Sequence, residues 1–397
     1  MSTTAVMESP STAAPTPSPE ELAARLADAP FVRVVVAPTG GALAASGVIA
    51  RALRERTVPF QVRVRRASAY TVDDDALTLR IGSAGPADLT LGDPARTPAV
   101  AFEVARALET AADPYLALAG IAAGEADPAA STLADRAGLE RSPGVGLPVT
   151  DLADGLGHTT LLHGPVSGGA DAAGATLAEW NLPAELDADA RRKFASLVAV
   201  ETTTAPGATP RAAESIARAL NPLHLGEDAP FATVEGYGDV LSAVAREDPG
   251  TGVALALGHD ARTGALEAWR THANHVHTTL REAETARYGG VFVVRVASAE
   301  ASADGTDAAE RRRAAGRLRT VARLARDFRS PEPTVLVVSE GVAAAATHDD
   351  AVDVTSALTT ALGPDETGTA DGTAREADAR FDGPPESFET AAREALS

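Results

Sequence analysis

Arginine is the residue type in this sequence with the clearest capacity for chemistry. Eight arginines stand between positions 311 and 329, namely Arg311, Arg312, Arg313, Arg317, Arg319, Arg323, Arg326 and Arg329. Spacings of three and four place several of them on one face of a helix that we expect over 308–328. That face could bind phosphate groups, or it could pair with carboxylates of this chain or of a partner. The sequence leaves both interpretations open.

A second candidate is the loop Thr39-Gly40-Gly41, between an expected strand at 31–37 and an expected helix at 42–56. Backbone N–H groups at the start of such a helix can bind a phosphate or another anion. The loop has neither the glycine pattern of a dinucleotide site nor the lysine of a nucleotide triphosphate loop. A purely structural turn is therefore the alternative interpretation.

Two clusters have residue types that could ligate metal. His272 and His275 share a helical face, whereas His277 lies off it, and no acidic residue follows at a recognised ligand spacing. We therefore expect solvated helix histidines. The run Asp73-Asp74-Asp75 has oxygen ligands, but in so acidic a chain we expect it to be a solvated loop.

The composition narrows the class of protein. The 397 residues include 55 acidic and 35 basic side chains, a net charge of −20, and no cysteine, which excludes a disulfide framework and a thiolate site. Lys193 is the only lysine. An acidic, arginine-rich chain that nearly lacks lysine is typical of an extreme halophile, where a Debye length of roughly 3 Å in molar salt screens self-repulsion. In such salt a negative net charge is a weak argument against nucleic-acid binding.

The order of expected elements predicts an α/β protein with two lobes. A strand, glycine loop, helix and strand over 31–64 form a βαβ unit and imply a parallel sheet. We expect a disordered tail at 1–20, an α/β domain at 21–225, a helical connector at 226–286 and a smaller α/β domain at 287–397. Further strands are expected at 77–81, 87–91, 158–163, 291–296, 334–338 and 374–381. Further helices are expected at 20–26, 99–111, 114–123, 187–200, 209–219, 237–247, 264–286 and 355–362, and a glycine loop at 368–372.

Residues 32–64 resemble the first βαβ unit of the DHH phosphoesterase superfamily, and in particular archaeal RecJ-like single-strand exonucleases. The family loop reads Asp-x-Asp-(Ala/Gly)-Leu, and here Thr39 and Gly41 stand at the two metal-binding aspartates around Gly40. The family's Asp-His-His motif has its nearest counterpart in 88–94, where Asp88, Gly92 and Asp93 stand without a histidine pair. Segments 236–258, 288–296, 322–328 and 334–341 are similar to the family's connector and its smaller DHH-associated domain, and 368–375 to its substrate loop.

The resemblance implies a parallel-sheet DHH-type domain joined by a helical connector to a DHH-associated domain. It also implies Mn²⁺ or Mg²⁺ in an active member, but without the Asp and His ligands a two-metal site should not assemble. The expected protein is thus a catalytically inactive scaffold that binds single-stranded DNA in replication or repair, needs no cofactor, and has the replicative helicase and GINS as candidate partners. The candidate nucleic-acid contacts are Arg313, Arg317, Gly372 and Arg375.

Two alternatives stay open. The first is an active metal-dependent exonuclease or small phosphoesterase with ligands rebuilt from residues such as Asp73–Asp75, Asp88, Asp93, His158 and His163. The second is a protein-interaction module with no nucleic-acid role. No run approaches 18 apolar residues and the N-terminus lacks a signal-peptide pattern, so we expect a cytoplasmic protein without a membrane span.

Overall fold

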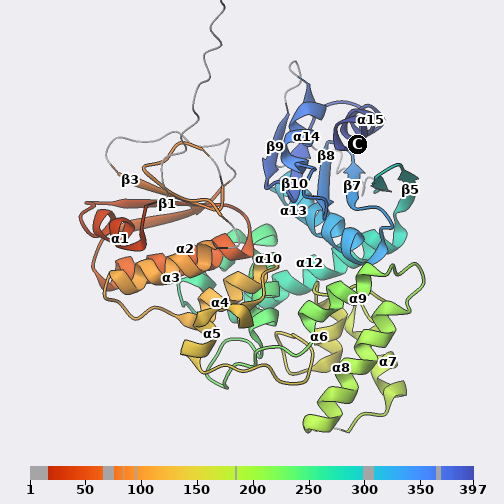
Figure 1. The fold of residues 1–397 in the computed structure, drawn as a ribbon, viewed down its shortest axis with the longest axis horizontal. Helices are drawn as coiled ribbons and strands as arrows, with labels where there is room; N and C mark the ends of the chain where they lie inside the picture. The colour runs from red at the N-terminus through yellow and green to blue at the C-terminus, as the bar shows by residue number, and fades with distance from the viewer. Residues whose placement is uncertain are drawn as a thin grey trace, which may run out of the picture.

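The N-terminal lobe is built on a four-stranded parallel sheet (Figure 1). The computed structural model describes residues 17–65, 76–83, 85–93, 96–183, 186–297, 308–363 and 368–397. The strand order is β2-β1-β3-β4, with β1 at Val32–Val36, β2 at Phe60–Val64, β3 at Leu77–Ile81 and β4 at Leu89–Leu91. β1 lies in the middle and is almost wholly buried, as expected of a short β-branched strand. The predicted βαβ unit and parallel sheet are confirmed.

The crossover between β1 and β2 is α2 (Gly40–Glu55), which packs against α3 (Thr97–Ala107) and α4 (Pro114–Ala123). α1 (Pro19–Ala27) begins inside the predicted tail. Ser18 accepts a hydrogen bond from the backbone N–H of Glu21, whose side chain accepts one in return from the Ser18 N–H. This reciprocal cap fixes the helix start, so the prediction of disorder was wrong for residues 19–20. Residues 1–16 lie outside the described chain.

The middle of the chain is helical. It comprises α5 (Thr132–Ala137), α6 (Leu152–His158), α7 (Ala170–Trp180), α8 (Ala188–Thr203), α9 (Arg211–Ile216), α10 (Val234–Glu247), α11 (Pro249–Ala256) and α12 (Arg262–Glu282), with short 3₁₀ turns at Pro128–Ala130 and Ala217–Ala219. The predicted strand at 158–163 was wrong, because α6 runs to His158 and Thr159 and Thr160 then bond to Asp239 of α10 rather than to a neighbouring strand.

The C-terminal lobe contains a six-stranded mixed sheet of order β5-β6-β7-β8-β10-β9. The strands are β5 (Glu284–Tyr288), β6 (Val291–Arg295), β7 (Thr334–Ser339), β8 (Val342–Thr347), β9 (Thr369–Gly372) and β10 (Glu376–Arg380). α13 (Ala308–Leu324), continued by a π-helical turn at Ala325–Arg329, packs on one face, whereas α14 (Val354–Leu362) and α15 (Pro385–Leu396) cover the other (Figure 1).

Two sequence predictions for this lobe differ from the structure, and one strand was not predicted. The helix expected over 264–286 ends at Glu282, because Ala283 is extended and 284–288 pairs with β6 as an edge strand. The expected loop at 368–372 is mostly strand β9. β8 had no predicted element, since four of its six residues, VAAAAT, are alanines, which have a low strand propensity, and its pairing with β7 and β10 determines its conformation.

The buried apolar side chains of the described residues form three hydrophobic clusters. One unites the N-terminal sheet and its helices with α10, α11 and the first half of α12. A second joins residues between 145 and 219 to α13 and one face of the second sheet, and a third fills the other face. The predicted domain limits remain predictions, and the packing places 145–219 with the C-terminal lobe. Across the described ranges, no helix combines the length and apolar character needed to cross a membrane.

Candidate functional site: an arginine-lined cleft between the lobes

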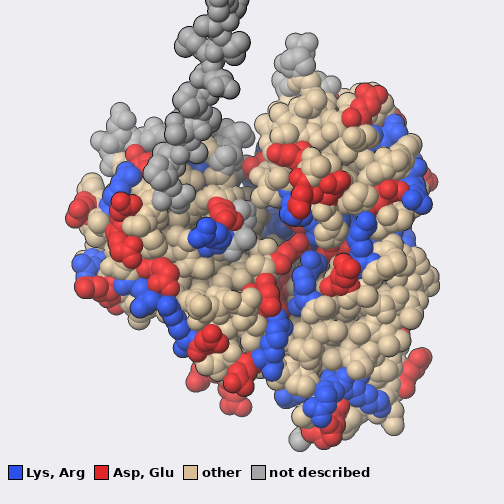
Figure 2. Space-filling view, viewed as in Figure 1, with Lys and Arg blue, Asp and Glu red and all other residues tan. Residues whose placement is uncertain are grey.

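A cavity of about 630 Å³, here called the outer cavity, lies where the two lobes face each other. Figure 2 shows a hollow between them with both basic and acidic side chains at its edge. The described residues that line it include two carboxylates, Glu247 and Asp378, and seven arginines: Arg63, Arg65, Arg246, Arg312, Arg313, Arg319 and Arg380. In a chain of net charge −20 this wall is strongly basic.

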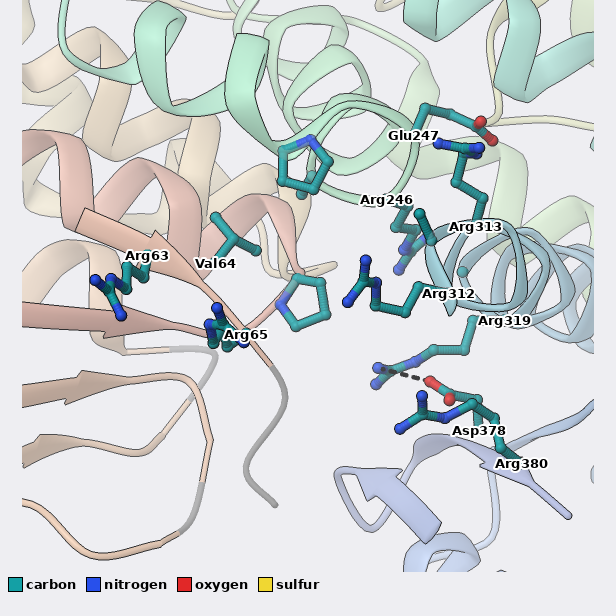
Figure 3. A pocket seen from close by; sticks show the side chains of 15 residues that line it. Arg63, Val64, Arg65, Arg246, Glu247, Arg312, Arg313, Arg319, Asp378 and Arg380 are labelled. Atoms are coloured by element: carbon teal, nitrogen blue, oxygen red, sulfur yellow. Dashed lines mark hydrogen bonds and ion pairs between the residues drawn. The ribbon is translucent and has the colours of Figure 1, made fainter. Parts of the chain in front are cut away.

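Four elements position these arginines. Arg63 lies in β2 and Arg65 directly follows it, on the side of the N-terminal lobe, while Arg312 and Arg319 project from α13 across the cavity (Figure 3). Positions 312 and 319 are seven residues apart and therefore share one helical face. Arg246 comes from the end of α10 and Arg380 from β10. A ligand in the cavity would meet guanidinium groups from both lobes.

The carboxylates of the wall are already engaged. Glu247 accepts two hydrogen bonds from Arg317, at 2.7 and 2.8 Å, and one from His272 Nδ1 at 2.8 Å. Burial alone would raise the pKa of Glu247, but the hydrogen bonds from His272 and Arg317 outweigh it and hold that pKa at about 2. Asp378, fully buried, lies 3.5 Å from Arg319 Nη1. Both carboxylates of the wall are thus engaged with arginines, Glu247 with Arg317 and Asp378 with Arg319.

A second cavity of about 310 Å³, the inner cavity, adjoins the first and shares Arg246 and Arg319 with it. It brings together predicted site residues that are more than 300 positions apart in the chain. These are Thr39, Gly40, Gly41, Asp93, Gly372 and Arg375. The loop after β1, the segment after β4 and the β9–β10 hairpin therefore meet at one place.

Within the inner cavity the Thr39 loop starts a helix, as predicted. The Thr39 hydroxyl accepts a hydrogen bond from the Ala42 N–H at 3.4 Å and caps α2. Gly40 is required by packing, because a Cβ there would lie 2.6 Å from the Ser242 hydroxyl and 2.8 Å from its backbone nitrogen. The glycine lets α2 approach α10 closely, which supports the structural interpretation of this loop.

Other predicted residues have partners of their own. Asp88 accepts a hydrogen bond from the Thr78 N–H at 2.7 Å and, like Gly92, does not line the inner cavity. Arg317 is committed to Glu247, and Arg375 pairs with Asp350. Arg313 lines the outer cavity and also pairs with the partly exposed Glu310.

A rebuilt metal site is not found in the described ranges, where no group of three or more His, Asp or Glu side chains could hold a metal ion. His158 bonds to Asp154, and His163 stacks on His277. The run Asp73–Asp75 lies outside the described residues. Those alternative metal ligands that the structure describes therefore do not come together in one site.

The expectation of solvated histidines was wrong for two of the three. His272 and His277 are buried, and His275 is exposed. His277 Nε2 lies 3.0 Å from the Thr159 carbonyl oxygen and its Nδ1 lies 3.0 Å from His163 Nδ1. Burial lowers the pKa of His277 to about 3 and that of His163 to about 2, so both rings are neutral and pack as core. A helical wheel misjudged this face because α12 is covered by the chain around 159–163 as well as by α10.

The C-terminal half of the arginine helix is paired within the protein. Arg326, with a side chain 2% exposed, contacts Glu125 at 2.9 Å and Asp327 at 2.8 Å. Asp327 is fully buried and also accepts hydrogen bonds from Arg218 and His348. Burial alone would raise the pKa of Asp327, but His348, Arg326 and Arg218 lower it far below its usual range. This cluster therefore binds the second lobe to the loop after α4.

Sequence reasoning missed Arg63, Arg65, Arg246 and Arg380 as members of the site. A signal was present for the first two. Arg63 is the second-last residue of the parallel strand β2 beside β1 and Arg65 directly follows it, at the carboxyl end where ligands of α/β sheets commonly bind. Arg246 and Arg380 gave no local signal, because only the tertiary fold brings α10 and β10 to the cleft.

Comparisons with known proteins agree with this architecture. The sequence model of the family described as "Uncharacterized protein rrnAC1427, C-terminal domain" matches residues 283–394. Protein rrnAC1427 of Haloarcula marismortui is 47% identical over 392 residues, which cover 96% of this chain and 98% of that protein.

Among solved structures, CDC45 from Entamoeba histolytica matches with a TM-score of 0.60 at 10% identity, over 95% of this chain and 98% of that one. RecJ from Thermus thermophilus, in complex with Mn²⁺, matches at 0.49 and 15% identity over 97% of this chain and 56% of that one. The CDC45 match carries the fold assignment, and the predicted two-lobed α/β fold is confirmed. At 47% identity over nearly its whole length, the chain belongs to the family of the Haloarcula protein rrnAC1427.

Proposed function

We propose that this protein binds single-stranded DNA through its phosphate groups in the cleft between the lobes, and that it does so without hydrolysing the strand. The observation that carries the proposal is the wall of seven arginines facing two engaged carboxylates, in a chain whose net charge is −20. Such a concentration of one charge opposite to that of the whole surface marks a site for an anionic ligand.

Arginine suits phosphate because its planar guanidinium can donate two parallel hydrogen bonds to one phosphate group. In molar salt long-range attraction is screened beyond roughly 3 Å, so only direct contacts contribute. Arg63 and Arg65 on one side and Arg312 on the other can make such contacts from both lobes.

The residues of the inner cavity do not fit a pair of divalent cations. Thr39 has one neutral hydroxyl and Gly41 has no side chain, where the RecJ-like pattern has aspartates. Glu125 and Glu376, which also line this cavity, lie within 2.9 and 3.5 Å of the Arg326 guanidinium. Arg246, Arg319 and Arg375 add further positive charge. We derive no hydrolytic step from this arrangement, and the proposal is a scaffold.

The proposed cellular role rests on analogy with proteins of this fold. A CDC45-like fold supports a role in DNA replication or repair in the cytoplasm, with the replicative helicase and GINS as candidate partners.

The test uses the full-length protein in molar KCl and a fluorescently labelled oligo-dT strand. We expect anisotropy to rise with protein concentration, the affinity to fall as KCl is raised, and the strand to stay intact when Mn²⁺ is added. Absence of binding to any single strand would contradict the binding role. Degradation of the strand, lost on changing Asp93 to Asn, would contradict the scaffold and favour an active exonuclease.

A further inference from the structure

Arg246 occupies a singular position in the cleft. It lines the outer cavity, the inner cavity and a third cavity of about 300 Å³ on the far side of α10. Among the described residues, no hydrogen-bond partner is found for its buried Nε. Burial and the neighbouring charges of Arg319 and Arg323 lower the pKa of Arg246 to about 10. An anion bound in the cleft would therefore meet a guanidinium that keeps a donor without a partner in the described chain.

A buried chain of hydrogen bonds fixes where this guanidinium points. Arg246 Nη1 donates to the Thr320 hydroxyl at 2.5 Å, and the same hydroxyl lies 2.9 Å from His272 Nε2. His272 Nδ1 in turn lies 2.8 Å from Glu247, which Arg317 holds with two bonds.

The protonation states of Glu247 and His272 determine which atom donates and which accepts in each of these hydrogen bonds. Glu247 is ionised, so His272 Nδ1 donates its proton to that carboxylate. Burial lowers the pKa of His272 from its ordinary value, so the ring is neutral and its Nε2 accepts from the Thr320 hydroxyl. The Thr320 oxygen is then free to accept from Arg246. The side chains of Thr320, His272 and Glu247 thus have partners within the chain, and the Nε of Arg246 is the buried donor left without one among the described residues.

Packing supports the same placement. A Cβ at Gly316 would lie 2.8 Å from Arg246 Cβ and 3.1 Å from its Cγ. Gly316 therefore leaves room for the Arg246 stem to cross α13. Arg319, 5% exposed and likewise with an Nε that finds no partner in the described chain, lies on the same helix beside it.

We propose that Arg246 is the central phosphate-binding residue of the cleft, and that Thr320, His272, Glu247 and Arg317 are positioning residues that aim it. This deepens the proposed function by naming one contact, and it assigns Arg317 a positioning role in place of the direct phosphate contact expected from the sequence. The ligand chemistry is a phosphate group, which a DNA strand or a free polyphosphate could supply.

The test compares four variants of the full-length protein: R246Q, T320V, T320S and the control R191Q, which removes an exposed arginine of α8. The probes are labelled oligo-dT across a KCl series, and inorganic tripolyphosphate followed by the shift in melting temperature. For R246Q we expect the slope of log affinity against log salt to fall by about 0.7, the value for one phosphate contact to a single strand.

For T320V we expect roughly tenfold weaker binding, the loss of one hydrogen bond to a charged group, with recovery in T320S. A merely structural role for Thr320 would lower the melting temperature without changing the salt slope.

The outcomes separate the two proposals. If oligo-dT binds the wild type and R246Q behaves as R191Q does, the inference about Arg246 is wrong and the proposed function stands. If oligo-dT fails but tripolyphosphate raises the melting temperature of the wild type and R191Q and not of R246Q, the Arg246 site stands and the single-strand role is wrong. If neither probe binds the wild type, both are overturned.

Discussion

Two arginine-rich regions of this molecule lie on the same helix and differ in how their charge is balanced. At its C-terminal end, Arg326 is enclosed by Glu125, Asp327 and Glu376. At its N-terminal end, Arg312 faces Arg63 and Arg65 across a cavity whose two carboxylates are held by Arg317 and Arg319. The sequence shows one continuous run of arginines, but the fold divides it by function.

The difference shows how structural and ligand-binding arginines can be told apart. A buried guanidinium that stabilises the fold has a carboxylate partner, since burying an unpaired charge costs several kcal/mol. A guanidinium meant for an external anion must instead line a cavity and keep donors that no carboxylate of the protein occupies. Changes in the first region should therefore affect stability, and changes in the second should affect binding.

The largest effect is expected from Asp327→Asn. This change removes the fully buried carboxylate that Arg326 and Arg218 share and leaves only the partly buried Glu125 and Glu376 beside them. Breaking a buried ion pair typically costs about 3–5 kcal/mol. Denaturation in molar KCl measures the loss of unfolding free energy. Asp350→Asn is the matched control, because Asp350 is 83% exposed and its pair with Arg375 should contribute at most about 1 kcal/mol. Equal losses in the two variants would remove the distinction between the regions.

A second expected effect concerns Glu235, a buried carboxylate whose nearest arginine, Arg141, stays 3.8 Å away. Here burial outweighs the backbone hydrogen bonds and Arg141, and it raises the pKa of Glu235 from 4.5 to about 7. The folded state then holds a proton that the unfolded state releases. The stabilisation of the folded state that comes with this proton is fully present below pH 4.5 and is lost as the pH rises through 7.

Glu235→Gln should therefore be more stable than the wild type above pH 7, by up to about 3 kcal/mol, and equal to it near pH 4.5. Unfolding free energies measured between pH 4.5 and 8 check this. A wild-type stability that does not fall over that interval would show that Arg141 does balance Glu235.

An intermediate effect is expected from Gly316→Ala, which places a methyl group against the Arg246 stem. Overpacking of this kind costs about 1–3 kcal/mol and should also displace the guanidinium, so binding of oligo-dT should weaken. Gly264→Ala is the control, since a Cβ there meets Thr251 at an ordinary 3.4 Å. Unchanged binding in Gly316→Ala would mean that the position of Arg246 does not matter.

The smallest effect on stability is expected from Arg63→Gln. No ion pair of Arg63 is found among the described residues, so the unfolding free energy should change by less than about 0.5 kcal/mol. The salt slope for oligo-dT should still fall by about 0.7. A variant that loses stability and keeps its slope would place Arg63 with the structural arginines.

Local pattern was sufficient to predict the N-terminal sheet, α2 and its cap, because a β-branched buried strand, two glycines and an amphipathic helix all favour the same structure. β8 and β5 escaped prediction for the opposite reason. Alanine-rich and charged segments become strands only when a neighbouring strand pairs with them.

The residues of the candidate site likewise fall into those that the sequence indicated and those that it did not. Family resemblance singled out the Thr39 loop, Asp93, Gly372 and Arg375 as separate motif positions, and the structure places all of them around the inner cavity. The resemblance did not predict that Arg317 would bind Glu247, 70 residues away, or that Arg246 would reach the cleft. Such contacts depend on how α10, α12 and α13 cross, and no short stretch of sequence encodes that geometry.

The most direct test of the account is the affinity of oligo-dT for a triple variant, R63Q/R65Q/R312Q, against a matched triple, R56Q/R191Q/R192Q, on exposed positions outside the cleft. Both carry the same change of charge. Measured across a KCl series, the cleft variant should lose about two units of salt slope and most of its affinity, whereas the control should bind as the wild type does. Equal affinities in the two triple variants would contradict binding in the cleft.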